Sequence, residues 1–380
     1  MRRAGKATLE YIKKADMFLL VLSLICSIFG IVLIWSSTRA FPGGAAPFLT
    51  IQILALFLGL FCFVLFSIID VEILAHRWKA ILIFNVLILL SLFVFGVGIE
   101  GGDRIWLRFF GIGIQPSEIV KITFVILMAY QIQYLKEYKN LNSFFSLMQL
   151  AAHFVLIFVL LPDMGNSLIF LFIFIVILFM GGVKLRWFAL GGALLIALFF
   201  IAWEGGFFAG YQMNRILAPF DSSIDPLNQG VRFQVHRSRI AIASGQIFGQ
   251  GLGQGAQTQT RHGVPEQHTD ILFSAAAEEF GFIGALVVIA LIVLVIIRCF
   301  YVGARARDTL SALTCVGVGS FIMFQSLINI GMTLGVGPVI GIAPPFFAYG
   351  GSSLVTTFIS LGLVSGVKMR TVSPWKRSLY

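Results

Sequence analysis

The chain has 380 residues, of which 58% are hydrophobic and 12% are charged, and its formal net charge is +10. Soluble globular proteins carry about 25% charged residues, so this chain has roughly half the charge that a water-facing surface needs. Its four cysteines show no metal-ligand spacing. These properties exclude a soluble enzyme and a disulfide scaffold, and they indicate a helical membrane protein.

Ten segments with few or no charges are long enough to cross a membrane. A span needs about 20 apolar residues, because a rise of ~1.5 Å per residue must cover a hydrocarbon core of ~30 Å. In chain order the predicted transmembrane helices are residues 17–36, 48–69, 79–98, 116–134, 144–161, 167–182, 187–203, 271–297, 309–334 and 346–366. The sequence therefore predicts an all-α polytopic membrane protein with ten transmembrane helices in a single membrane-embedded domain, residues 1–380.

The charged residues are divided unequally between the two sides of this predicted bundle. The side that holds the N-terminus carries 18 of the 27 Lys and Arg residues and six acids, whereas the other side carries nine basic residues and eleven acids. Because cytoplasmic loops are rich in Lys and Arg, both termini are predicted to be cytoplasmic. The positive net charge is thus a signal of topology and predicts no nucleic-acid partner. The first span follows a basic stretch without a clear cleavage site, which favours an uncleaved signal anchor.

The chain's long polar segment, residues 204–270, is predicted to be a large extracellular loop between spans seven and eight. Within it, residues 231–244 are amphipathic and predict a helix on the membrane surface or over the end of the bundle. The Gly-rich run 248–255 matches neither G-x-G-x-x-G nor a P-loop, which argues against a nucleotide site. Such a run leaves a flexible backbone that approaches a ligand or another helix. A zinc site is not supported by the spacing of His236, His262 and His268.

Two charged residues stand at the start of the fourth span. A charge at the centre of a membrane helix costs about 2.5–3.5 kcal/mol, so such residues usually mark a functional cavity. Glu118 and Lys121 are three residues apart and therefore share one helix face, where they can form an ion pair. Pro116 suits the first position of this helix. The pair is either part of a functional site or a structural device at the helix start.

A second group of acids lies where the polar segment meets span eight. Asp270 precedes the span, and Glu278 and Glu279 lie within it. One interpretation is a catalytic pocket in the outer leaflet with Asp270 at its floor. The other is N-capping by Asp270, which leaves the two glutamates unexplained. Asp163 is interpreted as a turn residue.

Seven blocks of motifs occur in order along the chain. They are Arg104-x-Trp106-Leu107 with Gln115-Pro-Ser-Glu-x-x-Lys121, Leu161-Pro-Asp-Met-Gly165, Gln234-x-x-x-Ser238-x-Ile-Ala-Ile, Pro265-Glu-Gln-His-Thr-Asp270, Glu278-Glu-Phe-Gly-Phe, Asn329-Ile-Gly-Met332 and Tyr349-Gly-Gly-Ser-Ser353. In these motifs the chain resembles the SEDS (shape, elongation, division and sporulation) proteins, the RodA/FtsW/SpoVE group of bacterial peptidoglycan glycosyltransferases. Two of the motifs, those at 265–268 and 329–332, resemble RodA more than FtsW. The chain departs from the family pattern at Arg232 and Gln246, where Gly is usual or common.

The resemblance implies an enzyme that polymerises lipid II, the undecaprenyl-pyrophosphate-linked disaccharide-pentapeptide, by inverting glycosyl transfer at the outer face of the bacterial cytoplasmic membrane. The implied partners are a class B penicillin-binding protein, which cross-links the peptides, and other elongasome or divisome membrane proteins. The implied catalytic residue is Asp270, either as the base for the acceptor hydroxyl or as a ligand of a divalent cation (Mg or Mn). The expected substrate-binding residues are Arg104, Glu118, Lys121, Arg215, Ser238, Arg239, His268 and Ser352.

Two other functions also suit a polar cavity in an apolar bundle. A flippase for lipid-linked cell-wall precursors would carry charges along a path to both faces, whereas here the charges within the spans gather at their outer ends. No inverted repeat, which is typical of transporters, is legible. A purely structural scaffold would tolerate neutralisation of Glu118 or Asp270. The distribution of charge favours chemistry at the outer face.

Overall fold

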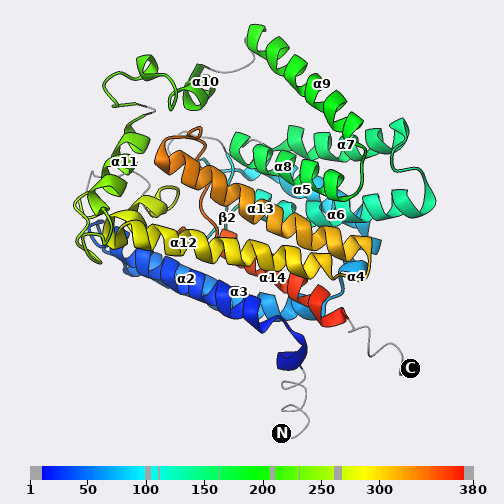
Figure 1. The fold of residues 1–380 in the computed structure, drawn as a ribbon, viewed down its shortest axis with the longest axis horizontal. Coiled ribbons are helices and arrows are strands. Elements are labelled where there is room, and N and C mark those ends of the chain that lie inside the picture. Colours follow the sequence, from blue (N-terminus) through cyan, green and yellow to red (C-terminus); the bar gives the residue numbers. More distant parts are fainter. Residues whose placement is uncertain are drawn as a thin grey trace, which may run out of the picture.

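The computed structural model describes residues 11–98, 104–109, 112–161, 163–205, 210–230, 232–260 and 268–371. Val231, His262 and residues 265–267 of the motif before Asp270 lie outside the described residues. The described chain is mainly helical, and most of its helices run side by side in one bundle (Figure 1).

Within the described part of the chain, seven helices are long and apolar enough to cross a membrane. They are α2 (Met17–Thr38), α3 (Ala46–Ile68), α5 (Trp78–Phe95), α6 (Pro116–Tyr138), α12 (Leu272–Ala304), α13 (Thr309–Leu334) and α14 (Gly351–Arg370). Three further helices have shorter apolar stretches, namely α7 (Phe144–Leu160), α8 (Met164–Met180) and α9 (Leu185–Glu204). Each of the ten predicted segments corresponds to one of these helices, and the chain is a multi-pass membrane protein. That all ten helices cross the membrane stays a prediction.

Short polar side chains fix where several helices begin. The carboxylate of Asp16 accepts the N–H of Leu19 at 3.3 Å at the start of α2, and that of Asp308 accepts the N–H of Ser311 at 2.8 Å at the start of α13. Asp163 does the same for α8, accepting the N–H of Gly165 at 2.8 Å. These N-caps satisfy backbone donors that the helix itself leaves without partners. Asp163 is therefore a capping residue, which agrees with its interpretation as a turn residue.

The sequence prediction omits a small sheet and a short helix. Residues on either side of Phe110 form a two-stranded antiparallel sheet, in which β1 (Leu107–Phe109) pairs with β2 (Ile112–Ile114) and Leu107 lies opposite Ile114. A short helix, α4 (Val71–His76), also precedes α5, and the carboxylate of Asp70 caps it by accepting the N–H of Glu72 at 3.1 Å. Both elements are too short to produce a clear hydrophobic period in the sequence.

The last span begins five residues later than predicted. Phe346 has a φ of 68°, and α14 starts only at Gly351. The backbone between α13 and α14, hereafter the 335–350 segment, is therefore non-helical although it lies within an uncharged stretch. Non-helical backbone at membrane depth requires polar partners from the protein, and Gln52 supplies two of them. Its amide donates to Ala348 O and accepts from Gly350 N, both at 3.1 Å.

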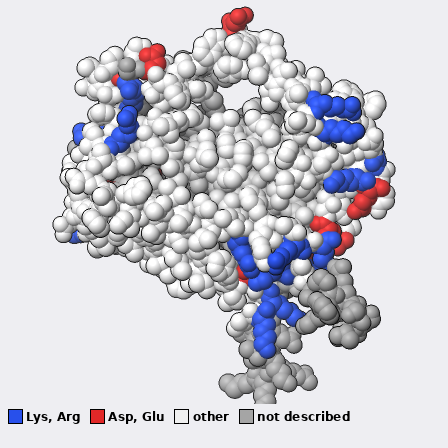
Figure 2. All heavy atoms as spheres, in the orientation of Figure 1, with Lys and Arg blue, Asp and Glu red and all other residues white. Residues whose placement is uncertain are grey.

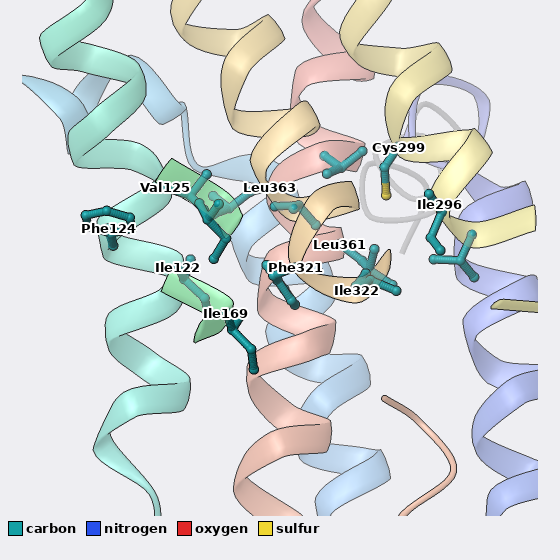
Figure 3. Packing of buried hydrophobic residues seen from close by; sticks show 14 of the residues in the cluster. Ile122, Phe124, Val125, Ile169, Ile296, Cys299, Phe321, Ile322, Leu361 and Leu363 are labelled. Carbon is teal, nitrogen blue, oxygen red and sulfur yellow. The ribbon is translucent and has the colours of Figure 1, made fainter. Parts of the chain in front are cut away.

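The apolar core extends through the bundle, and Figure 3 shows a part of it in which side chains from α6, α8, α12, α13 and α14 pack between the ribbons. Its buried members include Val125 of α6, Ile169 of α8, Ile296 of α12, Phe321 of α13 and Leu361 of α14. Lipid is as apolar as these side chains, so van der Waals packing rather than transfer from water holds the helices together.

The two ends of the described chain lie on the same side of the bundle. Asp16 is 0% exposed and pairs with Arg298 near the end of α12 through bonds of 2.8 and 3.0 Å. It also forms an ion pair of 3.4 Å with Lys368 at the end of α14. On the face drawn in Figure 2, Lys and Arg gather toward the ends of the molecule and leave a broad uncharged middle. This agrees with predicted termini on one side, and the cytoplasmic orientation stays a prediction.

The polar segment between α9 and α12 contains α10 (Gly210–Leu217), the 3-10 helix η1 (Ser222–Ile224) and α11 (Phe233–Gly245). Helix α11 is the predicted helix, and it packs against α12 and α13 (Figure 1). The prediction that it is amphipathic is wrong, because its buried residues are mostly small and its polar and apolar side chains are not separated into two faces. A Cβ atom on Gly245 would lie 1.9 Å from Ala277 O of α12, so only glycine permits this approach. Of the two predicted placements, the helix therefore adopts the one over the end of the bundle.

Helix α12 is broken at Gly281, whose φ of 68° and ψ of −164° are not helical. The backbone after α11 satisfies the groups that the break exposes. Gln250 N and Gly251 N donate to the carbonyls of Glu278 and Glu279 at 2.9 and 3.0 Å, and Phe282 N donates to Gln246 O at 2.8 Å. The Gly-rich run therefore approaches another helix, one of its two predicted roles. Gln246 itself has a φ of 50°, which explains why glycine suits this position.

Candidate active site

Asp270 lies in a turn immediately before α12 and is half-buried. The N-cap of α12 is Ile271, so the interpretation of Asp270 as the N-cap residue is wrong. The carboxylate faces the 335–350 segment instead. A Cβ atom on Gly341 would lie 3.1 Å from Asp270 Oδ2 and 3.7 Å from Arg215 Nη2. A carboxylate and a guanidinium thus both lie against one glycine, closely enough that a larger side chain at this position would crowd the carboxylate.

Three buried amides hold the 335–350 segment in place. Besides Gln52, these are Gln325 and Asn329, which lie one turn apart on α13. Gln325 Nε2 donates to Ala343 O at 2.9 Å, and Asn329 Nδ2 donates to Ile342 O at 2.7 Å. The same Asn329 nitrogen donates to Asp270 O at 2.5 Å. The segment beside the carboxylate is therefore fixed to α13 by consecutive carbonyls.

Glu118 and Lys121 form the predicted ion pair within α6, with 2.6 Å between Lys121 Nζ and Glu118 Oε1. Both side chains are buried. Lys121 also donates to Gln325 Oε1 at 3.3 Å, and Glu118 Oε2 accepts from Thr356 of α14 at 3.4 Å. Through Gln325 and Ala343, the pair is connected to the segment that faces Asp270. The helix α6 begins at Pro116, as predicted.

His268 and Ser352 lie on the α3 and α14 side of the site. The ring of His268 packs against Phe41, Phe48 and Tyr349, with centroid distances between 5.2 and 5.8 Å. Its backbone carbonyl accepts the N–H of Tyr349 at 2.8 Å. Ser352 lies in the first turn of α14, and its Oγ has no hydrogen-bond partner among the described residues. That hydroxyl is one turn before Thr356, which contacts Glu118.

A pocket between α11 and the 335–350 segment gathers positive charge. Arg232, His236 and Arg239 share one face of the start of α11 and line the pocket opposite Gly335 and Val339. The N–H of Val339 donates to Arg215 O at 3.0 Å, which brings α10 to the same place. Arg215 and Arg239 were expected from the sequence, whereas Arg232 and His236 were not. Their spacing of four and three residues in a predicted helix is the signal that identifies them.

The Asp225 carboxylate binds several backbone N–H groups of the loop that precedes α11. Partial burial raises the pKa of the Asp225 carboxyl, but hydrogen bonds from the N–H groups of Gly230, Arg232 and Gln229 outweigh this and hold the pKa below its usual range. The carboxylate therefore stays charged at neutral pH and loses these donors only in acid. It fixes the backbone of Arg232 at the pocket.

Two expected residues lie apart from Asp270. Ser238 is 0% exposed, and its hydroxyl donates to Thr333 O at 2.9 Å, which ties α11 to α13. Arg104 is exposed beside the end of α5, where Trp106 pairs with Val97. Among the described residues, no hydrogen bond or ion pair joins Arg104 to the other expected residues. Neither position tests the predicted contact with substrate.

Glu278 and Glu279 bind the polar segment to the bundle. Glu278 accepts the N–H of Gln257 at 2.7 Å and the N–H of Thr258 at 2.9 Å. Glu279 Oε1 accepts the hydroxyl of Ser36 at 2.5 Å, while its Oε2 is buried without a hydrogen-bond partner among the described residues. The two glutamates that capping left unexplained are therefore connectors between α12 and the backbone around it.

Of the described residues, no group of three or more His, Cys, Asp or Glu side chains lies together as a protein-held metal site would require. Mg²⁺ is commonly held by one or two carboxylates together with substrate phosphates. Asp270 is therefore a donor that fits a shared site with a phosphate ligand, and it does not form a metal cage by itself.

Comparison with known proteins shows what the chain is similar to. The sequence model of the FtsW/RodA/SpoVE family, described as cell cycle proteins, matches residues 16–372. The chain is 33% identical over 369 residues to the probable peptidoglycan glycosyltransferase FtsW of Geobacter sp. (strain M18), covering 93% of this chain and 97% of that protein. The corresponding Bacillus subtilis protein is also 33% identical, over 91% of this chain and 88% of its own length.

Solved structures with the same fold agree. A chain of a peptidoglycan synthase complex that coordinates polymerisation and crosslinking superposes with a TM-score of 0.77 and 27% identity, covering 94% of this chain and 99% of that chain. The rod shape-determining protein RodA of Thermus thermophilus gives a TM-score of 0.68 with 25% identity, covering 94% of this chain and 98% of that chain. Because the named sequence relatives are FtsW proteins and the named structure is RodA, the predicted preference for the RodA branch stays a prediction. The chain belongs to the FtsW/RodA/SpoVE family, the SEDS proteins that its motifs resemble.

Proposed function

We propose that this chain is a peptidoglycan glycosyltransferase that polymerises lipid II at the outer face of the bacterial cytoplasmic membrane. The observation that carries the proposal is the position of the Asp270 carboxylate and the Arg215 guanidinium on Gly341, where the polar segment meets an apolar bundle. The similarity to probable peptidoglycan glycosyltransferases supports the reaction class.

In the proposed reaction the hydroxyl of the acceptor sugar attacks the anomeric carbon of the donor, and the bond from that carbon to the pyrophosphate oxygen breaks. The hydroxyl proton passes to Asp270, and the electron pair of the broken bond leaves with undecaprenyl pyrophosphate. Attack from the side opposite the leaving group converts an α linkage into a β linkage, so the transfer is inverting. This step requires a base for the hydroxyl and positive charge for the departing oxygen.

The cationic pocket beside Arg215 supplies the second requirement. Arg215 and Arg239, with Arg232 and His236 of the same pocket, would hold the pyrophosphate through charge-assisted hydrogen bonds, which are the strong class of such contacts. Glu118 orients Lys121, and their connection through Gln325 supports the backbone that faces Asp270. His268, Ser352, Ser238 and Arg104 complete the proposed substrate-binding set, in which Ser238 acts by holding α11 and its neighbour Arg239.

A divalent cation is the alternative use of the Asp270 carboxylate. Mg²⁺ or Mn²⁺ shared between this carboxylate and the pyrophosphate would neutralise the charge of the leaving group. The two uses differ in their response to a chelator, because a base works without added metal. Polymerisation measured with and without a chelator separates them.

The proposed partner is a class B penicillin-binding protein. A similar chain of known structure belongs to a synthase complex that coordinates polymerisation and crosslinking. A partner that cross-links the peptides of the growing strand is the natural counterpart of a polymerase that makes only the glycan. Other membrane proteins of the elongation or division machinery complete the proposed assembly.

The test uses the purified chain with its partner and labelled lipid II in detergent. Asp270→Asn removes the base while keeping the side-chain volume, so we expect a fall in glycan synthesis of at least about 100-fold. Asp308→Asn is the matched control, because Asp308 caps the start of α13, the end of that helix away from Asn329. Full polymerisation by Asp270→Asn would refute the catalytic assignment. Lipid II translocation in vesicles without glycan synthesis would instead identify a flippase.

A further inference from the structure

Asn329 is a buried amide that joins two backbone segments at the candidate site. It is 0% exposed on α13. Its Nδ2 donates to Asp270 O at 2.5 Å and to Ile342 O at 2.7 Å, while its Oδ1 has no hydrogen-bond partner among the described residues. The side chain therefore serves here as a donor to two carbonyls, and one of them belongs to the proposed base.

The two carbonyls belong to the two backbone segments that approach each other at the Asp270 carboxylate. One is the backbone of Asp270 itself, and the other follows Gly341, the residue against which Oδ2 lies. A shift of either segment changes the space beside the carboxylate, because a Cβ atom on Gly341 would already come within 3.1 Å of Oδ2.

We propose that Asn329 is a positioning residue for Asp270, which holds the carboxylate and the Gly341 backbone in the geometry that transfer requires. The inference rests on the proposed function. Asn329 touches neither the carboxylate nor the reacting atoms, so it acts through the two carbonyls. Aspartate at this position cannot donate, and alanine removes both bonds. A displacement of about 1 Å in a reacting group can cost roughly 100-fold in rate.

Gln52 of α3 provides a matched control, because it binds the same 335–350 segment. It is also a 0% exposed amide, and it makes two hydrogen bonds to the 335–350 segment, at Ala348 O and Gly350 N. Its contacts are several residues beyond Gly341 and include none with Asp270. Replacing either amide by alanine removes two hydrogen bonds to backbone groups, of which Gln52 makes both to the segment and Asn329 makes one to the segment and one to Asp270 O. A purely structural role therefore predicts similar consequences for the two variants.

The experiment compares Asn329→Ala and Gln52→Ala in the complex with the partner, measuring kcat and KM for lipid II and the Tm of each variant. We expect both Tm values to fall by similar amounts. For Asn329→Ala we expect kcat to fall roughly 10- to 100-fold with KM changed less than about threefold, while Gln52→Ala keeps kcat within about threefold. The shape of the pH–rate profile stays the same, because the amide does not touch the carboxylate.

Equal loss of kcat in the two variants would overturn the inference, as would a loss confined to KM. Should Asn329→Ala fail to fold, Gly341→Ala tests the same geometry from the other side, because it places a carbon atom against Asp270 Oδ2. Unchanged kcat in a folded Gly341→Ala would also overturn the inference. Absence of glycan synthesis by the unaltered complex would refute the proposed function itself, and full activity of Asp270→Asn would refute the catalytic role of Asp270. Inactivity of Asp270→Asn with equal amide variants refutes only the role of Asn329.

Discussion

At the scale of single residues, the partners of buried charges could be predicted from the sequence, whereas the partners of buried amides could not. Glu118 and Lys121 could be paired from the sequence because a spacing of three places them on one helix face, and their atoms lie 2.6 Å apart. The amides of Gln52, Gln325 and Asn329 gave no comparable signal. A lone amide in an apolar helix has no partner within its own helix, so its role depends on which carbonyl another segment brings to it.

The buried pair leads to a prediction for stability. Lys121→Met leaves the Glu118 carboxylate buried without its cation, and removing one member of a buried pair typically costs about 3–5 kcal/mol. We expect a clear fall in the Tm of the detergent-purified protein. The double variant Glu118→Gln/Lys121→Met removes both charges and should recover part of that loss. A double variant as unstable as the single one would show that the charge pair is not the cause.

At the scale of elements, helix α12 differs most from its sequence prediction. The sequence predicts residues 271–297 as a single unbroken span, although Glu278 and Glu279 interrupt its apolar residues. The structure breaks it at Gly281 because backbone from a distant segment, residues 246–251, supplies the hydrogen bonds that the helix gives up. Hydropathy reports only that a segment prefers lipid, and a break of this kind leaves that preference unchanged.

The break predicts a sharp contrast between two glycines. Gly281→Ala must place a Cβ atom 2.4 Å from Gly249 N and from Ile247 O in a backbone region that only glycine adopts readily. We expect a loss of about 2 kcal/mol or more, seen as a lower Tm. Gly191→Ala on α9 is the control, because nothing lies within 4 Å of its Cβ position. A Tm unchanged by Gly281→Ala would mean that α12 is continuous there.

At the scale of the whole molecule, Asp16 joins three helices that are far apart in sequence. It caps α2, pairs with Arg298 of α12 and lies 3.4 Å from Lys368 of α14. This cluster is at the opposite end of the bundle from α11 and Asp270. It therefore contributes to the packing of the bundle rather than to the candidate active site.

We expect Asp16→Asn to lower the Tm, with a cost of about 2 kcal/mol because Arg298 and Lys368 are only partly exposed and lose their shared anion. The polymerisation rate per folded molecule should stay unchanged. Asp70→Asn is the comparison, since its 3.0 Å pair with Arg370 is more exposed and exposed pairs contribute little. A loss of rate per folded molecule in Asp16→Asn would connect this cluster to the site and contradict the separation.

The sequence by itself determined the apolar segments, the long polar segment, the Glu118–Lys121 pair and the family. These follow from local properties, since hydropathy, helical spacing and motifs are all read from neighbouring residues. Only the tertiary structure decided the break in α12, the cationic pocket and the contacts of Asp270 with Gly341 and Asn329. Asn329 is 59 residues from Asp270 along the chain. Its hydrogen bond exists because α12 and α13 pack together with the 335–350 segment between them, and no local pattern encodes that arrangement.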